Sequence, residues 1–544
     1  MTRRSRCYAL FCAAVALANA FARPCFAQAA PRLPGELVWT IGYDPKTFDP
    51  AKVDDQESEM VRYLTAGVLL RFNRLTQKVE PQLAQSWSLS QDGKTVTFKL
   101  RPHLRFSDGS SLSAQDVAWS IRRVLLPATA APVAEEFVAP SGVTVATPNP
   151  STIVVRLPQR VVGIGKIFDE IAIEPANRPS EARITSGPFV LADYRRSQYV
   201  RLRRNPYFSR SGGSGPALAA GVRLDILENP EQEIQLFERG EYDLIQGLAP
   251  DYFEFLKHRD PSSVRDLGPS LNTEQMWFNQ FPGAPIAAWE KAWFANRAFR
   301  VAIAQAIHRD DLARIAYLGH ATPAYGFISP ANTAWFDGSL SPPHTDVAAA
   351  RAGLARAGFR WNGAHLEDAS GHAVRFSILT NAGNAARQKM ATLIQQDLAA
   401  LGIDVTVVAL DFPALIERLM HTQDYEACLL GLENVDPDPD AMMNQWLSSS
   451  PNHQWDPSEK TPATPWEAEI DREMNLQASA RLDSVRKRAV DRVQQIVADE
   501  QPFIYLVYPN VLVAVSPRLQ GVHPAVLAPS LVWNVQDLHL AEAR

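Results

Sequence analysis

Residues 374–410 read VRFSILTNAGNAARQKMATLIQQDLAALGIDVTVVAL and predict a strand, a helix and a second strand. The segments 374–380 and 403–410 are short and rich in β-branched and apolar residues, as buried strands are. Apolar residues recur at helical spacing over 386–401, and Gly402 provides the stop signal. Because a strand–helix–strand unit places its two strands in parallel, this stretch predicts an α/β lobe.

The first half of the chain adds further elements. Strand patterns occur at 37–42, 95–100, 152–157, 189–194 and 199–204, the last two as a hairpin. One helix is clearly marked among them, because Ser113 and Asp116 form an acidic variant of the capping box. Its apolar stripe consists of Val117, Ile121, Val124 and Leu125. The first half is therefore expected to be richer in strands than the second.

Length and charge limit the classes of protein to which the chain can belong. Its 544 residues exceed what one hydrophobic core usually serves, so we expect at least two lobes. With 46% hydrophobic residues, intrinsic disorder is excluded. The formal net charge of −5 provides no basic surface for nucleic acid, whose binding depends largely on neutralising phosphates.

The N-terminus predicts a secretory signal. Arginines within the first six residues precede the uncharged stretch 7–22, and Ala-Gln-Ala at 27–29 is a pattern that signal peptidase recognises. The uncharged stretch is shorter than the roughly 20 residues of a membrane-spanning helix, which disfavours an anchor. We expect cleavage after about Ala29, which removes four arginines and no acid and so changes the formal charge from −5 to −9. The Sec and twin-arginine export routes both stay open.

Signatures of catalysis are missing from the sequence. It contains no Gly-x-Ser-x-Gly, His-Glu-x-x-His, Cys-x-x-Cys, Walker or Gly-x-Gly-x-x-Gly motif. The eleven histidines include no pair spaced three or four residues apart, as a helical metal site requires. Cys428 is the one cysteine left after signal cleavage, and its apolar surroundings predict a buried structural thiol. We therefore expect no catalytic residue, no metal and no cofactor.

An acidic loop is the first candidate for ligand binding. Four carboxylates occur within 433–440, directly after the predicted strand that contains Cys428. In α/β sheets, loops at the carboxyl ends of strands bind ligands. A solvated Asp-Pro turn would produce the same pattern, and taken alone the sequence favours that simpler interpretation. Calcium is disfavoured, because prolines alternate with the acids and the glycine of a calcium loop is missing.

A series of segments gives the chain a recognisable resemblance. They are DPKTFDP at 44–50, PQLAQSW at 81–87, DGKTVTFKLR at 92–101, FSDG at 106–109, AQDV at 114–117, SGPF at 186–189, RNPYF at 204–208, WFN at 277–279 and FRVAIAQAIHR at 299–309. In this order they resemble the extracellular solute-binding proteins of peptide-type ABC transporters, family 5, the oligopeptide- and dipeptide-binding class. The resemblance covers essentially the whole chain after the signal.

The resemblance implies an α/β fold of two lobes that close on a ligand, the class II periplasmic-binding-protein clamp of the large peptide-binding type. An additional subdomain is expected on the first lobe. Carried onto this chain, lobe I spans 30–272 with an inserted subdomain at about 66–184. Lobe II spans 273–504, and 505–544 returns to lobe I.

The family also implies where a ligand binds. Dipeptide binders use an aspartate in the loop matching 431–440 to hold the peptide's amino group, and Glu433 or Asp436 could take that role here. The arginine that grips a dipeptide's carboxylate aligns with Thr380, a departure that favours longer peptides or a broader range. The candidate ligand-binding residues are Glu433, Asn434, Asp436, Asn279, Thr380, Asn381 and Trp446.

The function that follows is capture of a small peptide in the periplasm and its delivery to the permease subunits of an ABC transporter. A monomer is expected, with no nucleic-acid partner and no enzymatic activity. The same fold could instead bind an oligosaccharide, an opine-like conjugate or a nickel chelate. A secreted hydrolase is the alternative of another class, and it would need a nucleophile with a partnered base, which the sequence does not show. A chaperone-like holder of peptide or haem is not distinguished by sequence.

Overall fold

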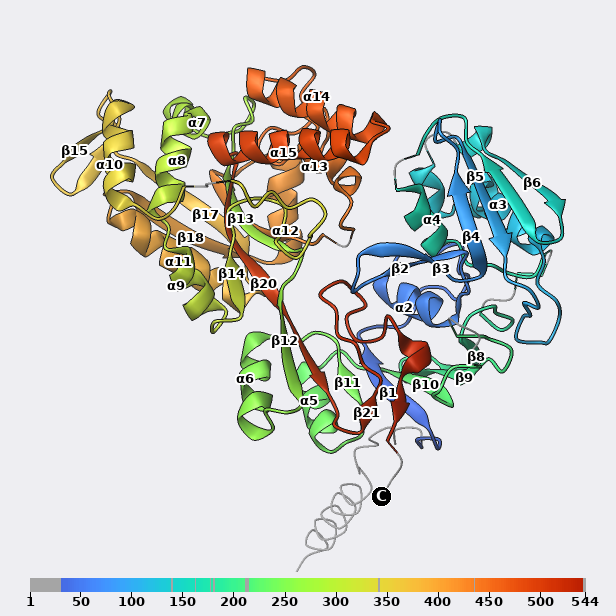
Figure 1. Cartoon of the computed structure of the whole chain (residues 1–544). Coiled ribbons are helices and arrows are strands. Elements are labelled where there is room, and N and C mark those ends of the chain that lie inside the picture. Colours follow the sequence, from blue (N-terminus) through green and yellow to red (C-terminus); the bar gives the residue numbers. More distant parts are fainter. Residues whose placement is uncertain are drawn as a thin grey trace, which may run out of the picture.

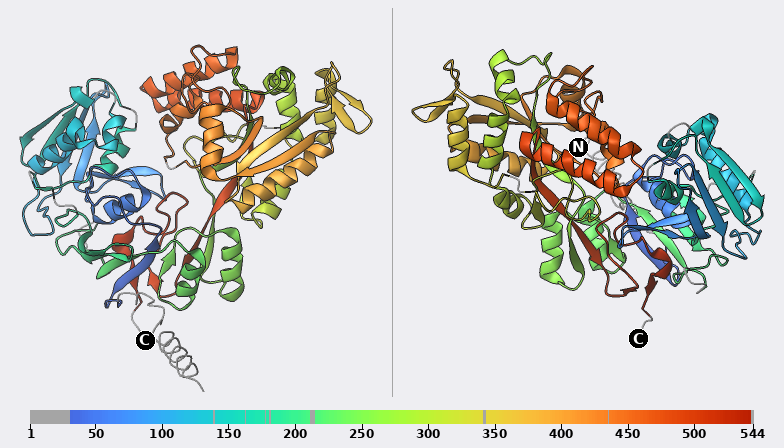
Figure 2. Two further views of the ribbon diagram at one scale, coloured as in Figure 1. Left: turned by 180° about the vertical axis from the view of Figure 1, so that it is seen from behind. Right: turned by 45° about the horizontal axis from the view of Figure 1, so that its top comes forward.

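The structure, a computed structural model, describes residues 31–541 apart from 138–139, 162, 177, 180–181, 211–214, 341–342 and 435. The predicted signal sequence lies outside the described residues. The described chain forms two lobes, and an additional subdomain is attached to the first (Figure 1). The same division is visible from behind and with the top turned forward (Figure 2).

A four-stranded sheet organises lobe I. In spatial order its strands are β1 (Glu36–Ile41), β10 (Gly221–Ile226), β9 (Tyr199–Arg204) and β8 (Phe189–Arg195). β8 and β9 form the predicted hairpin, whereas β1 and β10 come from distant parts of the sequence and pair in parallel. The lobe also contains α5 (Pro230–Glu238), β11 (Leu244–Ile245), α6 (Pro250–Arg259), β21 (Leu519–Gln520) and β22 (His539–Leu540).

A second four-stranded sheet forms the subdomain. Its order is β4 (Ala84–Leu89), β5 (Thr95–Leu100), β7 (Thr152–Arg156) and β6 (Thr144–Asn149), with every neighbouring pair antiparallel. The helix α3 (Ala114–Leu125) buries most of its predicted stripe in the subdomain core. Its capping box is present as predicted, because Asp116 accepts a hydrogen bond from the Ser113 backbone N–H at 2.8 Å.

Four short elements lie next to the subdomain sheet, and the last of them contributes to the subdomain core (Figure 1). They are α2 (Gln56–Thr65), β2 (Leu70–Asn73), β3 (Lys78–Pro81) and α4 (Ile164–Glu170). β2 and β3 pair antiparallel, and α4 packs on β2. This layer therefore forms the side of the subdomain that faces lobe II (Figure 1).

Lobe II is built on the sheet that the opening stretch of sequence predicts. Its strands run in the order β20 (Phe503–Val515), β13 (Thr273–Phe278), β19 (Ala427–Leu432), β17 (Arg375–Asn381) and β18 (Asp404–Leu410), with β14 (Ala321–Pro323) on the other side of β20. β17 and β18 pair in parallel from Arg375–Asp404 to Asn381–Leu410, which confirms the predicted strand–helix–strand unit. The connecting helix is α11 (Ala385–Ala399).

Helices cover both faces of this sheet. Alternate residues of β13 show the division, because Met276 and Phe278 point into one apolar core and Trp277 into another. The first core includes residues of α8 (Arg297–Ala306), α10 (Val347–Arg356) and α11, and the second residues of α14 (Pro465–Ser479) and α15 (Asp483–Glu500). The remaining helices of lobe II are α7 (Ala288–Ala295), α9 (Arg309–Asp311), α12 (Phe412–Ile416) and α13 (Met443–Trp446), and β15 (Arg360–Asn362) and β16 (His365–Glu367) form a small hairpin.

Two adjacent segments connect the lobes. One is β12 (Val264–Pro269) followed by β13, and the other is the long strand β20. Residues 503–509 of β20 pair with β13 and β14, whereas residues 510–515 pair with β11 and β12. A single strand thus belongs to both lobes, and Figure 1 shows it running from one to the other.

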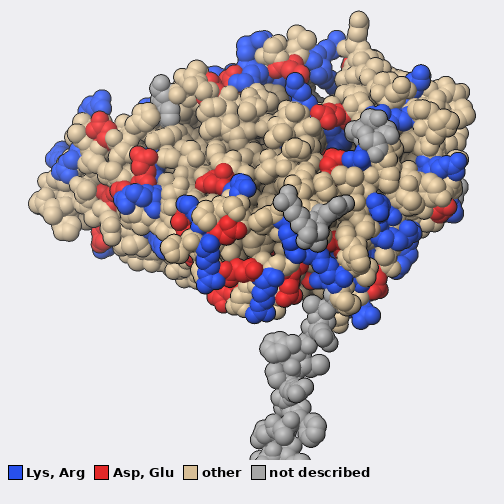
Figure 3. Space-filling model, turned by 60° about the horizontal axis from the view of Figure 1, so that its bottom comes forward, with Lys and Arg blue, Asp and Glu red and all other residues tan. Residues whose placement is uncertain are grey.

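The part of the chain that the structure describes has no helix long and apolar enough to span a membrane. On the face drawn in Figure 3, acidic and basic side chains are interspersed among uncharged ones, and the coloured residues form no broad area of one sign.

Candidate functional site

A cavity of about 720 Å³ lies where the two lobes meet. This volume is within the range of about 300–1,000 Å³ that is typical of small-molecule sites. Its wall consists mainly of residues 53–63 with α2, residues 72–74, residues 166–170 of α4, the link 270–272 between β12 and β13, the loop 433–437 after β19, and residues 526–530. Because these segments come from both lobes, a movement of one lobe on the other changes the cavity.

The loop after β19 contains the four carboxylates that the sequence singles out, and two of them hold the loop in place. Asp438 binds the buried guanidinium of Arg486, which lies on α15, with N–O distances of 2.5 and 3.2 Å. Asp440 accepts a hydrogen bond of 3.1 Å from the Gln477 amide on α14. Burial raises the pKa of the Asp440 carboxyl, and the Gln477 bond opposes this shift.

Asp436 points across the cavity. Its carboxylate is 2.5 Å from Nζ of Lys166, which lies on α4 and has the ring of Phe72 4.9 Å away. The ion pair joins the subdomain to lobe II. The Asp436 side chain is 39% exposed, so the pair is worth about 1 kcal/mol or less. A contact of this strength can break without loss of the fold.

Glu433 is the acid of this loop whose carboxylate has no partner among the described residues. It is exposed and lines the cavity, and among the described residues it takes part in no hydrogen bond or ion pair. Its neighbour Asn434 fixes the backbone here, because the Asn434 N–H donates to Asn272 Oδ1 at 2.9 Å and its side-chain amide donates to the Leu271 carbonyl at 3.0 Å. The loop therefore presents a free carboxylate from an anchored backbone.

The opposite wall is held together by paired charges. Arg62 binds both carboxylate oxygens of Glu59 at 2.6 Å, and its Nη1 donates to the carbonyls of Asp169 and Glu170 at 3.0 Å. The Asp169 carboxylate in turn accepts a hydrogen bond of 2.9 Å from Arg71. These contacts fasten α2 to α4, so this wall is preorganised.

The cavity wall also contains acidic and other hydrogen-bond-accepting groups. Glu170 is accessible from the cavity yet surrounded by protein, and this enclosure raises the pKa of its carboxyl. The same effect, followed by the proximity of Glu170, raises the pKa of Glu136 to about 8. Asp55 Oδ2 and Gln246 Oε1 are buried and have no hydrogen-bond partner among the described residues. The wall is therefore suited to a ligand that donates hydrogen bonds or carries positive charge.

Four of the predicted ligand-binding residues lie outside the cavity lining. Asn279 is buried and its amide donates to the carbonyls of Gln423 and Tyr425, both at 2.9 Å. Thr380 is fully buried in β17, and Asn381 accepts a hydrogen bond of 3.1 Å from Arg387.

Trp446 is the fourth. It is fully buried in an aromatic cluster with Phe327, Trp455 and Phe503, so it packs the core of lobe II. The other three predicted residues, Glu433, Asn434 and Asp436, are brought together in the cavity wall.

Sequence reasoning did not find Lys166, Arg62 or Gln246. Each lies in a segment without a motif, and each acquires its place only when distant parts of the chain meet. Cys428, by contrast, is buried as predicted, and its burial raises the pKa of the thiol well above the ordinary range.

Two α/β lobes, joined by two adjacent segments and enclosing a cavity without a catalytic constellation in its described lining, define a two-lobed substrate-binding protein. The bacterial extracellular solute-binding proteins, family 5 Middle, match residues 78–454, and the chain belongs to this family. This confirms both the predicted fold and the expectation of a solute-binding protein of an ABC transporter rather than an enzyme.

Individual relatives span nearly the whole chain. A probable ABC transporter-binding protein of Deinococcus radiodurans is 25% identical and covers 88% of this chain and 87% of its own. The oligopeptide-binding protein AppA of Bacillus subtilis is 22% identical, with 90% and 89% covered. The crystal structure of the ABC transporter substrate-binding protein CtaP of Listeria monocytogenes has a TM-score of 0.76 at 22% identity, covering 93% of this chain and 99% of that one.

Proposed function

We propose that this protein captures a small peptide in the periplasm and delivers it, as a monomer, to the permease subunits of an ABC transporter in the inner membrane. Membership in the family and the predicted export signal support this assignment. The name of the Bacillus relative, an oligopeptide-binding protein, favours a peptide as the ligand. Relatives of Escherichia coli that are named for nickel and glutathione show that the family includes other ligands.

The single observation that carries the peptide assignment is the uncommitted Glu433 carboxylate in the cavity wall. A peptide's terminal ammonium is a strong donor, and a charge-assisted hydrogen bond gains strength when a closed cavity excludes water. The neighbouring acids are less suited, because Asp438 and Asp440 hold the loop to α14 and α15. Glu433 therefore binds the amino end of the ligand.

Other groups of the wall complete the recognition. The acceptors Asp55 Oδ2 and Gln246 Oε1 suit backbone N–H donors of an extended peptide. Lys166 offers a cation for the peptide's carboxylate once Asp436 releases it. Such contacts to main-chain groups do not depend on the peptide's side chains, which is consistent with a broad range of sequences.

Native mass spectrometry of the mature protein, purified from a periplasmic fraction, tests the class of ligand. We expect co-purified peptides of mixed sequence, released on denaturation and identified by fragmentation. Peptides would also reveal the length that the cavity accepts. A sugar, an opine or a nickel chelate in their place would contradict the peptide assignment and leave the family unchanged.

A substitution tests the role of the carboxylate. Glu433→Gln keeps the shape and removes the charge, so we expect peptide affinity by calorimetry to fall at least about tenfold, as for the loss of one charge-assisted contact. Glu417→Gln is the matched control, because Glu417 is an exposed acid of the same lobe outside the cavity lining. Equal affinity in the two variants would show that Glu433 does not hold the ligand.

A further inference from the structure

A second group of polar side chains lies in lobe II, outside the cavity lining. The segment between α13 and α14 folds back on itself, with the Glu459 N–H donating to the Ser448 carbonyl at 3.0 Å and the Ser458 N–H to the Ser450 carbonyl at 2.9 Å. This fold brings His453 and Glu459 next to Glu467, in the first turn of α14. The side chains of the three residues are 1%, 5% and 3% exposed, so the group is sealed from solvent.

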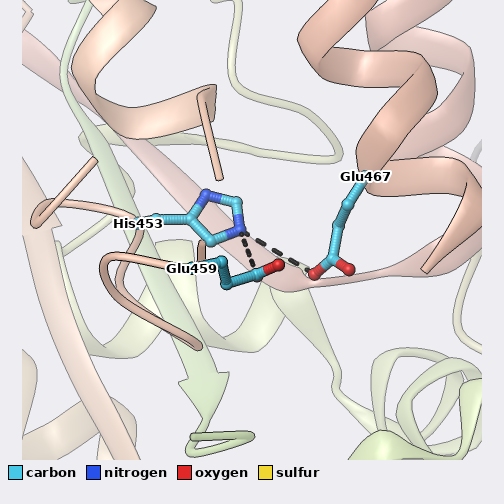
Figure 4. A group of neighbouring side chains, drawn as sticks. All are labelled: His453, Glu459 and Glu467. Carbon is cyan, nitrogen blue, oxygen red and sulfur yellow. Dashed lines mark ion pairs between the residues drawn. The ribbon is translucent and has the colours of Figure 1, made fainter. Parts of the chain in front are cut away.

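The three side chains converge on one point (Figure 4). His453 Nε2 is 3.5 Å from Glu459 Oε1 and 3.8 Å from Glu467 Oε1, and one ligand atom from each residue lies within 4.8 Å of the others. His453 Nδ1 is 3.3 Å from the Gln445 carbonyl oxygen, and the opposite ring nitrogen, Nε2, faces the two carboxylates.

Part of this group is left unsatisfied by the protein. His453 Nε2 and Glu459 Oε1 are buried and have no hydrogen-bond partner among the described residues. The other carboxylate oxygens are held in place, because Glu459 Oε2 accepts from the Ala463 N–H at 2.6 Å and Glu467 accepts from Trp455 Nε1 at 2.9 Å and Thr464 Oγ1 at 2.7 Å. Two of the three ligand atoms thus have no hydrogen-bond partner, and outer contacts orient the carboxylates, an arrangement that is typical of a metal site.

The charged residues of the group also favour a bound cation. Asp456, which is 6% exposed, interacts electrostatically with both His453 and Glu467, and adds a third buried carboxyl group to the two that face the imidazole. Arg300 also interacts electrostatically with Glu467, as His453 does, but its guanidinium donates to the carbonyls of Phe294 and Glu500 at 2.9 and 3.0 Å. Buried carboxylates are costly without a counter-ion, and a divalent cation would supply one here.

We propose that His453, Glu459 and Glu467 provide three ligand atoms for a divalent first-row transition-metal ion such as Zn²⁺, at a site separate from the ligand cavity. An imidazole nitrogen with two carboxylate oxygens is a donor set that zinc accepts. A tetrahedral ion with bonds of about 2.0–2.1 Å places its ligands about 3.3 Å apart, close to the separations of 3.5 and 3.8 Å seen here. The ion ties the 447–464 segment to the first turn of α14.

Zinc binding to the mature, untagged protein tests this site. After chelator treatment and dialysis, incubation with Zn²⁺ and a second dialysis are expected to leave about one equivalent of zinc by elemental analysis. Because the ion binds the folded state, the melting temperature should rise by about 5 °C at saturating zinc. Retention below about 0.1 equivalent, with no change in melting temperature, would overturn the proposal.

Variants locate the ion. His453→Gln and Glu459→Gln should each lose the bound zinc and the thermal shift, and circular dichroism verifies that they fold. Glu459→Gln is the safer variant, because it also removes a buried charge. His372→Gln is the matched control, since His372 lies 2.9 Å from the Asp368 carboxylate but is 40% exposed. Zinc that is retained by both site variants, or lost in Glu433→Gln or His372→Gln instead, would overturn this assignment.

Discussion

At the scale of single residues, the acidic loop shows how neighbours in sequence acquire different tasks. Asp436 and Asp438 are two positions apart, yet one reaches a lysine of the subdomain and the other a buried arginine of α15. The sequence shows the carboxylates but not their partners, because Lys166 and Arg486 belong to distant segments. The same applies to His453, because Glu459 and Glu467 follow it by six and fourteen residues, which is no spacing that marks a cluster in the sequence.

Removing the charge of either aspartate should therefore have unequal effects on stability. Asp438→Asn leaves the guanidinium of Arg486, 5% exposed, without its counter-ion, so we expect the free energy of unfolding to fall by about 3–5 kcal/mol. Asp436→Asn breaks a pair whose acid is 39% exposed and should cost about 1 kcal/mol or less. Urea denaturation measures both, and equal losses would contradict the assigned environments.

At the scale of elements, signals within one stretch of sequence are sufficient to predict a helix or strand and its bounds. The unit of β17, α11 and β18 follows from periodicity alone, and its strand and helix bounds agree with the expected ones to within two residues. The sequence also predicts the capping box of α3, because Ser113 and Asp116 are three residues apart and need no distant partner. Pairings between separate units, such as β1 with β10, had no such signal because they depend on how the whole chain packs.

Gly402, in the turn between α11 and β18, is a position where the backbone requires glycine. Its φ of +82° lies in the left-handed region, and a Cβ there would approach the Ala364 carbonyl oxygen to 2.4 Å. Gly402→Ala should therefore lower the free energy of unfolding by at least about 1–2 kcal/mol. Gly383→Ala, in the loop before α11 with open space around it, should change it by about 0.5 kcal/mol or less. If Gly402→Ala leaves the free energy of unfolding unchanged in thermal or urea denaturation, the turn described here is wrong.

At the scale of the whole molecule, the lobes touch across the cavity through weak polar contacts. Besides the Lys166–Asp436 pair, the Gln77 amide, between β2 and β3, donates to the Ala331 carbonyl of lobe II at 2.7 Å. Contacts of this kind cost little to break, so a ligand held by both lobes should shift the population towards the closed form. The fold class that allows such closure was predicted from the resemblance, whereas these contacts were not, because each joins residues far apart in the sequence.

Solution scattering measures the closure. Saturation with a co-purified peptide should reduce the radius of gyration of the wild-type protein, and Glu433→Gln should need at least about tenfold more peptide for the same change. The Glu417→Gln control should follow the wild type. Superimposable curves with and without saturating ligand would show that binding does not move the lobes.

The strand β20 also determines the order in which the molecule can be completed. It is made from residues 503–515, so a ribosome has made every strand that pairs with it before this strand exists. Until then, β13 and β14 lack the partner between them, and β11 and β12 lack theirs. The four-stranded sheet of lobe I does not include β20, but the sheet that joins the two lobes stays incomplete until this strand is made. A chain that stops at residue 500 therefore lacks the strand that pairs with elements of both lobes.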